Sequence, residues 1–268
     1  MGDEREGPSW LPYLAGALAG GALAVLWQAL SRDRRRLDPT LIRARRDDPD
    51  IAPTVIIPGV LGSELVRPDG TRAWLNAGNA VGYHDLGLPL WLPLSSSTDG
   101  LMPGGLLGVD TALPRLFGFT EYADLLDLLD DAGFSRDHRP GGRGAAYHVF
   151  TYDWRRDLIE SVRRLDEQLE RLADAWGDPD MRFNLVGHSM GGLLLRYYLR
   201  YGTAEPIPGA PVTWAGAKRV ASAVLIATPN AGTILALDGL LNGNRVGFST
   251  TTLSPAPCCG LRRSRPAT

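Results

Sequence analysis

The sequence has few cysteines and little net charge, and both shortages exclude classes of protein. Its only two cysteines, Cys258 and Cys259, are adjacent, so they cannot cross-link distant parts of a fold. The formal net charge of −2 over 268 residues excludes nucleic-acid binding through an overall basic field. No His, Cys and carboxylate cluster has metal-ligand spacing, and no glycine-rich loop fits a phosphate. The sequence therefore predicts no metal, no other cofactor and no nucleic-acid partner, and it leaves the oligomeric state open.

A long uncharged segment near the N-terminus indicates membrane attachment. Residues 7–31 carry no charge and are numerous enough to cross a hydrocarbon layer of roughly 30 Å as a helix. Trp10 and Tyr13 at one end and Trp27 at the other match an interfacial aromatic belt. We expect an apolar helix that spans the membrane, and the arginine-rich residues 32–36 would then keep the rest of the chain in the cytoplasm. The alternative is an alanine-rich helix that lies on a membrane surface or against a partner.

The rest of the chain divides by composition and periodicity. A charged linker follows the apolar segment, and near the C-terminus the periodicity is lost while Pro, Arg and Ser become frequent. We therefore expect four parts: an N-terminal apolar helix (1–31), a charged linker (32–50), a partial α/β domain (51–252) with a lid-like insert at about 67–117, and an irregular tail (253–268).

Within the body of the chain, short apolar runs alternate with amphipathic helical patterns. This alternation is typical of a mostly parallel sheet with helices on both faces. The apolar runs predict strands, and the 3.6-residue patterns predict helices between them. The expected strands are 54–57, 147–152, 183–186 and 220–227, and the expected helices are 120–132, 157–176 and 190–201.

The strongest motif is the pentapeptide Gly187-His-Ser-Met-Gly191, which joins an expected strand to an expected helix. A G-x-S-x-G pattern alone is a weak signal, but strand, turn and helix are the context that a nucleophile elbow requires. The elbow strains the serine backbone, and only small residues two positions away, here Gly187 and Gly191, leave room for it. His188 and Ser189 lie at the tip of this turn. The sequence therefore predicts Ser189 as a nucleophile, while a glycine-rich turn without chemistry is the alternative.

Three other expected strands also end in polar or glycine-rich loops. Residues 58–63 (PGVLGS), 150–156 (FTYDWRR) and 226–233 (IATPNAGT) would meet the elbow at the carboxyl edge of a parallel sheet, where such folds bind their ligands. Beside Trp154, we expect Asp153 and Arg155 to form a structural ion pair near the site rather than to act in catalysis.

In this order, the four segments resemble the lecithin:cholesterol acyltransferase family, which is related to phospholipid:diacylglycerol acyltransferases and bacterial lipase-like proteins. The resemblance covers residues 51–252. It implies an α/β-hydrolase fold and a serine acyl-enzyme that acts on phospholipid or neutral-lipid esters at a membrane surface. It also implies that the backbone N–H groups of Val60 and Met190 form the oxyanion hole. Trp74 and Trp91, in the insert, would belong to lid and membrane-binding elements.

The sequence departs from the family pattern after the elbow. A serine nucleophile needs a general base and an orienting acid, and in this fold an Asp and then a His follow the serine. After Ser189 the chain has one aspartate, Asp238, and no histidine. The last two strands of the fold also have no sequence to form them, which would leave residues 220–227 as an apolar edge strand. The four histidines are at 84, 138, 148 and 188.

Three hypotheses remain from the sequence. The first is an acyltransferase or lipase of the family, impaired because the Asp and His of the triad are absent, in a shortened gene product. The second is a catalytically inactive, membrane-tethered fragment that binds lipid. The third is a truncated chain that does not fold stably. The motifs do not distinguish a transferase from a hydrolase, since that choice depends on whether water or another alcohol reaches the acyl-enzyme.

Overall fold

The computed structural model describes part of the chain. The N-terminal segment, the linker and the tail beyond residue 253 lie outside the described residues, and so does the expected apolar helix. Within the described part, no helix has the length and apolarity that a membrane crossing needs. The described residues are 51–74, 86, 88, 98–109, 121–136, 145–205, 207–234, 236, 244–245 and 252–253.

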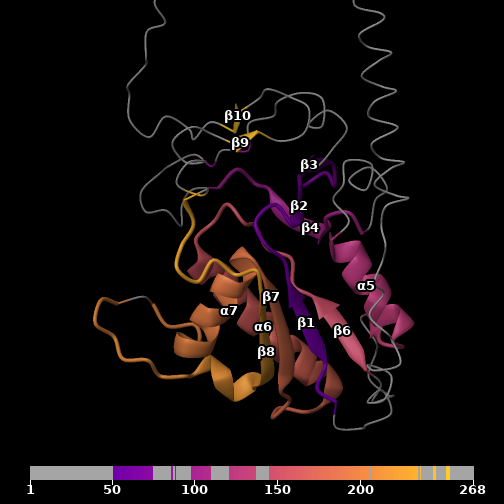
Figure 1. The fold of residues 1–268 in the computed structure, drawn as a ribbon, viewed down its shortest axis with the longest axis vertical. Coiled ribbons are helices and arrows are strands. Elements are labelled where there is room, and N and C mark those ends of the chain that lie inside the picture. The colour runs from indigo at the N-terminus through magenta and orange to yellow at the C-terminus, as the bar shows by residue number, and fades with distance from the viewer. Residues whose placement is uncertain are drawn as a thin grey trace, which may run out of the picture. The chain divides into compact units, whose positions relative to one another are not determined.

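A five-stranded parallel sheet lies at the centre of the fold (Figure 1). β1 pairs with both β6 and β7, so the first strand of the body lies between strands that come much later in the chain. The continuous burial of β1 fits a strand that is covered on both faces. The strands, in their order across the sheet, are β5 (Ser135–Arg136), β6 (Ala146–Val149), β1 (Thr54–Ile57), β7 (Phe183–His188) and β8 (Val220–Ile226).

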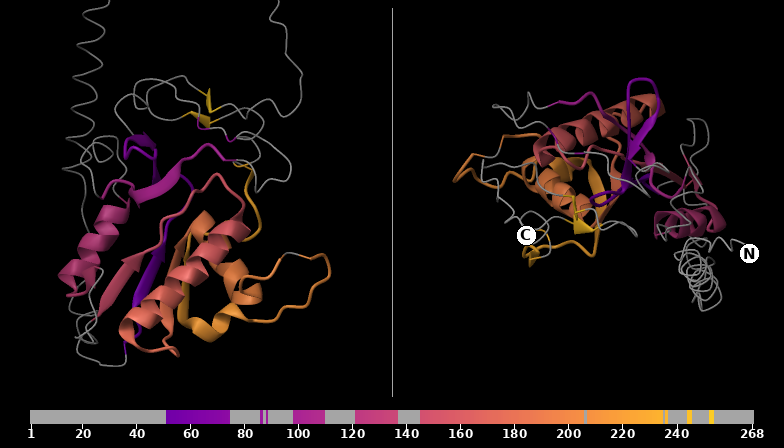
Figure 2. Two further views of the ribbon diagram at one scale, coloured as in Figure 1. Left: turned by 180° about the vertical axis from the view of Figure 1, so that it is seen from behind. Right: turned by 90° about the horizontal axis from the view of Figure 1, so that it is seen from above.

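Helices cover both faces of this sheet. Side chains alternate along a strand, so Val55 and Ile57 face one layer while Ile56 faces the other. The first two belong to a cluster with α6 and α7, and Ile56 packs with residues of α5. Figures 1 and 2 show α5 next to β6, away from α6 and α7. The α/β architecture that the sequence predicts is confirmed. The helices are α5 (Glu121–Asp131), α6 (Leu158–Trp176) and α7 (Met190–Tyr201).

The insert and the strand before it, β2, form a second, antiparallel sheet with its own small core. Its strands lie in the order β3, β2, β4, and Leu65 and Trp74 on them pack with Leu86 and Leu107. The remaining short elements lie later in the chain. The bounds are β2 (Ser63–Val66), β3 (Arg72–Trp74), β4 (Met102–Leu106), η2 (Gly216–Arg219), β9 (Asn244–Arg245) and β10 (Thr252–Leu253).

Most expected elements form where the sequence places them, and the differences have local causes. α7 has the bounds that the pattern predicts. α6 begins one residue later than expected, because Asp157 is its N-cap and accepts a hydrogen bond from the Ile159 N–H. The expected strand 147–152 ends at Val149, since the N–H of Tyr152 donates to a serine side chain outside the sheet.

β8 is an edge strand of the described sheet, as the sequence leads us to expect. Its residues after Val220 are exposed, including the apolar Val224, Leu225 and Ile226. Among the described residues, no strand pairs with its outer edge. Its inner edge pairs with β7 along the whole length of that strand, which supports the turn that follows β7.

Candidate active site

Ser189 lies at a sharp turn between β7 and α7, in a backbone conformation that non-glycine residues rarely adopt. Its φ is 51° and its ψ is −119°, outside the regions that sterics allow readily for L-residues. The Ser189 N–H donates a hydrogen bond of 2.8 Å to the carbonyl oxygen of Ile226 at the end of β8. The neighbouring strand thus holds the turn in its strained shape, which is the geometry that the G-x-S-x-G motif predicts.

The glycines on either side of Ser189 are required by close packing. A Cβ on Gly187 would lie 2.8 Å from the backbone oxygen of Gly191. A Cβ on Gly191 would lie 2.4 Å from the carbonyl oxygens of both Ile57 and Pro58, at the end of β1. These distances are far below ordinary van der Waals contact, and the atoms that they involve belong to backbone. The turn therefore packs against itself and against β1 only because both positions lack a side chain.

The strain at Ser189 gives a stability prediction. Glycine adopts positive φ at little cost, whereas alanine keeps the Cβ that makes this conformation unfavourable. We expect the Ser189→Gly variant to be more stable than Ser189→Ala by about 1–3 kcal/mol, measured by urea unfolding of both variants. Equal stabilities would contradict the strained geometry of the turn.

The β1–β2 loop (residues 58–62) lies against the elbow. A Cβ on Gly59 would be 2.9 Å from the Cβ of Ser189, so the loop backbone passes directly beside the serine. Val60, the next residue, is 50% exposed, and within the described part of the chain its N–H donates to no acceptor. Met190 is the first residue of α7, so its N–H has no intrahelical acceptor. The structure thus brings the two expected oxyanion donors to the segments that adjoin Ser189.

Three buried or partly buried aromatic side chains form hydrogen bonds with the backbone of the β1–β2 loop and of the first residue of β2. Burial raises the pKa of the Tyr152 hydroxyl, which keeps it protonated as a hydrogen-bond donor. All three side chains donate to backbone carbonyl oxygens, which fixes the path of the loop. The bonds run from Tyr152 Oη to Pro58 O (2.9 Å), from Trp74 Nε1 to Leu61 O (3.2 Å) and from Trp154 Nε1 to Ser63 O (3.2 Å).

Of the two tryptophans that the resemblance assigns to a lid, the structure describes Trp74. Trp74 is 2% exposed on β3, and its ring packs edge-on against Trp154 at a centroid distance of 6.0 Å. This buried position under the β1–β2 loop differs from the exposed position that contact with a membrane requires. Trp91 lies outside the described residues.

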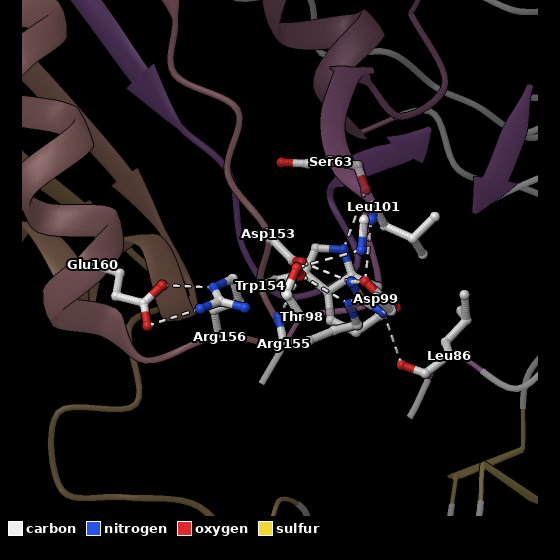
Figure 3. A network of polar contacts seen from close by, with 11 residues as sticks. Ser63, Leu86, Thr98, Asp99, Leu101, Asp153, Trp154, Arg155, Arg156 and Glu160 are labelled. Carbon is white, nitrogen blue, oxygen red and sulfur yellow. Dashed lines mark hydrogen bonds and ion pairs between the residues drawn. The ribbon is translucent and has the colours of Figure 1, made fainter. Parts of the chain in front are cut away.

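Arg155 lies between two carboxylates beside the loop, as Figure 3 shows. Its guanidinium donates to Asp153 at 2.7 and 2.9 Å and to Asp99 at 2.6 and 3.1 Å. The side chains of Arg155 and Asp153 are 5% and 3% exposed. The expected Asp153–Arg155 ion pair is therefore confirmed as a buried, bidentate pair. Trp154, between them in sequence, points to Ser63 and joins this network to β2 (Figure 3).

The network shifts the pKa values of Asp99 and Arg155. Burial opposes the charge of Asp99, but hydrogen bonds from Arg155 and from the Leu101 N–H outweigh it and lower the pKa of the Asp99 carboxyl. Burial also opposes the charge of Arg155, but hydrogen bonds to Asp153 and Asp99 outweigh it and raise the pKa of the guanidinium. Asp99 and Arg155 are thus both charged at neutral pH, which suits a structural clamp between the insert and the strand exit after β6.

The two histidines that the structure describes, His148 and His188, have other surroundings than the serine hydroxyl. His188 Nδ1 lies 2.8 Å from the hydroxyl of Tyr122 on α5, and His148 is buried in β6. In the described part of the chain, no histidine forms a hydrogen bond with Ser189 Oγ. The histidines at 84 and 138 lie outside the described residues.

Sequence reasoning missed two partners of the site, Tyr122 and Asp99. Tyr122 contacts residues 63 and 66 positions away in the chain, and Asp99 contacts a residue 56 positions away. No local pattern identifies such partners, because spacing on one element says nothing about a distant one. The available signal was a tyrosine on the buried side of an amphipathic helix, since a buried phenol needs a hydrogen-bond partner.

The sequence is similar to known proteins of one family. The family model for lecithin:cholesterol acyltransferase matches residues 109–267, which is more than half of the chain. Lecithin-cholesterol acyltransferase-like 4 of Arabidopsis thaliana is 24% identical over 176 residues, which are 57% of this chain and 31% of that protein. The match thus spans about a third of the relative's length. The family match includes α5, the Asp153–Arg155 pair and the elbow, but begins after the β1–β2 loop. On these grounds the chain belongs to the lecithin:cholesterol acyltransferase family.

Proposed function

We propose that this chain transfers or hydrolyses fatty-acyl groups of phospholipids or neutral lipids through an acyl-enzyme on Ser189. The observation that carries the proposal is the strained backbone of Ser189 with Gly59 packed against it. A serine held in this way at the start of a helix is exposed to a substrate and lies beside free amides. Family membership supports ester lipids as the substrate class. We further propose that the N-terminal apolar segment attaches this α/β-hydrolase domain to the membrane that holds those lipids.

The proposed reaction has two steps. Ser189 Oγ attacks the ester carbonyl carbon, and the carbonyl electron pair moves to the oxygen, where the N–H groups of Val60 and Met190 stabilise it. Collapse of this intermediate re-forms the carbonyl and breaks the bond to the leaving oxygen, which takes up the proton lost by the serine hydroxyl and departs as an alcohol, so that the acyl-serine remains. A second alcohol or water then attacks the acyl-serine and restores the hydroxyl. Transfer and hydrolysis differ only in that second attack.

The source of the general base decides how fast the reaction runs. The sequence has no histidine after Ser189, and in the described part of the chain no histidine forms a hydrogen bond with the Ser189 hydroxyl. An oxyanion hole without its triad still accelerates the reaction by about 10³ to 10⁴ over water. We therefore propose slow turnover for this chain alone. The same observation favours a second candidate, a lipid-binding fragment without turnover.

A fluorophosphonate probe tests the proposed nucleophile. Attack by Ser189 Oγ on phosphorus forms an O–P bond and releases fluoride, so the serine peptide gains a fixed mass. We expect mass spectrometry to find this label on Ser189 in the folded chain, and to find it much reduced after urea denaturation. The Ser189→Ala variant should take no label at the elbow.

The matched control is Ser222→Ala, because Ser222 is an exposed serine on β8 whose hydroxyl donates to Asn184 Oδ1, away from the elbow turn. We expect this variant to be labelled like the unmodified chain. Absence of label on the folded chain would refute the nucleophile. If that chain and Ser189→Ala then bound phosphatidylcholine vesicles equally, the lipid-binding candidate would be favoured.

A further inference from the structure

The hydroxyl of Tyr122 joins the two segments that carry the proposed oxyanion donors. The N–H of Gly59 donates to this hydroxyl oxygen at 2.7 Å. On the other side, the same hydroxyl lies 2.8 Å from His188 Nδ1. Gly59 immediately precedes Val60, and His188 lies two residues before Met190. One side-chain atom on α5 therefore contacts both segments that form the proposed oxyanion hole. Each contact lies within two residues of the N–H donor of its segment.

The surroundings of Tyr122 hold its hydroxyl in place. The residue is 9% exposed and packs with Ile56, Leu106 and Leu126 between α5 and the sheet. Its ring also lies edge-on to the His188 ring at a centroid distance of 5.6 Å. A Cβ on Gly62 would come within 3.0 Å of the hydroxyl, so the β1–β2 loop closes around it. The hydroxyl therefore has little freedom to leave this position.

The hydrogen-bond directions are consistent with a single linked unit. The phenol oxygen accepts from the Gly59 N–H, and its own hydrogen can be donated to His188 Nδ1 in the tautomer that carries the ring proton on Nε2. Hydrogen bonds that share an atom in this way polarise and strengthen one another. A shift of the loop away from the elbow would break this unit at the hydroxyl.

We propose that Tyr122 is a positioning residue that sets the separation between the Val60 amide and the Ser189–Met190 turn. Its action is through Gly59 and His188, and it does not touch the reacting atoms. Oxyanion stabilisation depends steeply on donor placement, because the donors must already point to where charge develops. This inference rests on the proposed function, since it assigns the residue that keeps the two donors of the same oxyanion hole at the required separation.

The test is Tyr122→Phe in the full chain, with fluorophosphonate labelling of Ser189 followed over time and probe concentration. The phosphonyl oxygen occupies the place of the oxyanion, so a displaced donor slows the bond-forming step. We expect the limiting rate of labelling to fall at least tenfold, while the half-saturating probe concentration changes less than twofold. If Tyr122 acted only in folding, its loss would not lower the limiting rate while it left the half-saturating probe concentration nearly unchanged.

The matched control is Tyr147→Phe. Tyr147 belongs to the same buried cluster, and its hydroxyl also bonds to α5, at Asp130 Oδ1 over 2.9 Å. This variant loses a tyrosine–α5 hydrogen bond without touching the elbow, so its labelling constants should match those of the unmodified chain. Equal labelling rates for both tyrosine variants would overturn the positioning role. If the unmodified chain were not labelled at all, the proposed function itself would fail.

A second variant covers the case in which Tyr122→Phe does not fold. His188→Phe keeps an aromatic ring beside Tyr122 and removes the ring nitrogens, including the Nδ1 that lies 2.8 Å from the Tyr122 hydroxyl. We expect a fall in the limiting labelling rate with little change in half-saturation, smaller than that of Tyr122→Phe. An unchanged limiting rate in folded His188→Phe would equally overturn the inference, because the link to the elbow would then carry no effect.

Discussion

The Gly191→Ala variant should lose about 3 kcal/mol or more of stability and should no longer be labelled at Ser189. The added Cβ would lie 2.4 Å from the carbonyl oxygens of Ile57 and Pro58, both of them backbone atoms at the carboxyl end of β1. The clash can be relieved only if β1 and α7 separate by about 1 Å, since ordinary contact begins near 3.4 Å. Such a separation would carry Pro58 and the loop behind it away from the elbow. Urea unfolding and fluorophosphonate labelling of the same preparation measure the two effects.

Gly177→Ala is the matched control for this variant. Gly177 ends α6 at φ 65°, and a Cβ there would meet no atom within 4 Å. The only expected cost is the left-handed conformation, about 1–2 kcal/mol, and labelling of Ser189 should be unaffected. A Gly191→Ala variant as stable and as reactive as Gly177→Ala would show that β1 does not approach the elbow as closely as described.

Local signals in the sequence predicted the catalytic turn and its flanking elements. A strand, a G-x-S-x-G turn and a helix in direct succession depend on neighbouring residues, so α7 and the strain at Ser189 could be inferred from one short segment. The ion pair of Asp153 and Arg155 could also be predicted, because the two residues are two positions apart and follow the same strand.

Contacts between distant segments could not be predicted in the same way. The bond from Gly59 to Tyr122 and that from Arg155 to Asp99 join residues 63 and 56 positions apart. They depend on how α5 and the insert pack against the sheet, which no periodicity describes. The position of Trp74 has the same origin, since its burial follows from the small antiparallel sheet that the insert forms. The resemblance identified the family correctly, but it did not predict the two hydrogen bonds or the burial of Trp74.

The Arg155→Met variant should lose about 3–5 kcal/mol of stability, with a fall in Tm on the order of 10 °C. The substitution keeps much of the side-chain volume but removes the charge between Asp153 and Asp99. The Asp153 side chain is 3% exposed, so its carboxylate would stay buried without its cationic partner, and water could not replace the lost interaction. Thermal unfolding followed by circular dichroism measures this loss.

The neighbouring residue gives the control, because Arg156 also forms an ion pair, with Glu160 one helical turn away. Its side chain and that of Glu160 are only partly buried, so Arg156→Met should cost about 0.5 kcal/mol or less. Adding Asp153→Asn to Arg155→Met should restore part of the lost stability, since the unpaired buried charge is then gone. Equal unfolding midpoints for Arg155→Met and Arg156→Met would contradict the clamp. The Asp153–Arg155–Asp99 network would then form as a result of the contact between the strand exit and the insert, without stabilising that contact.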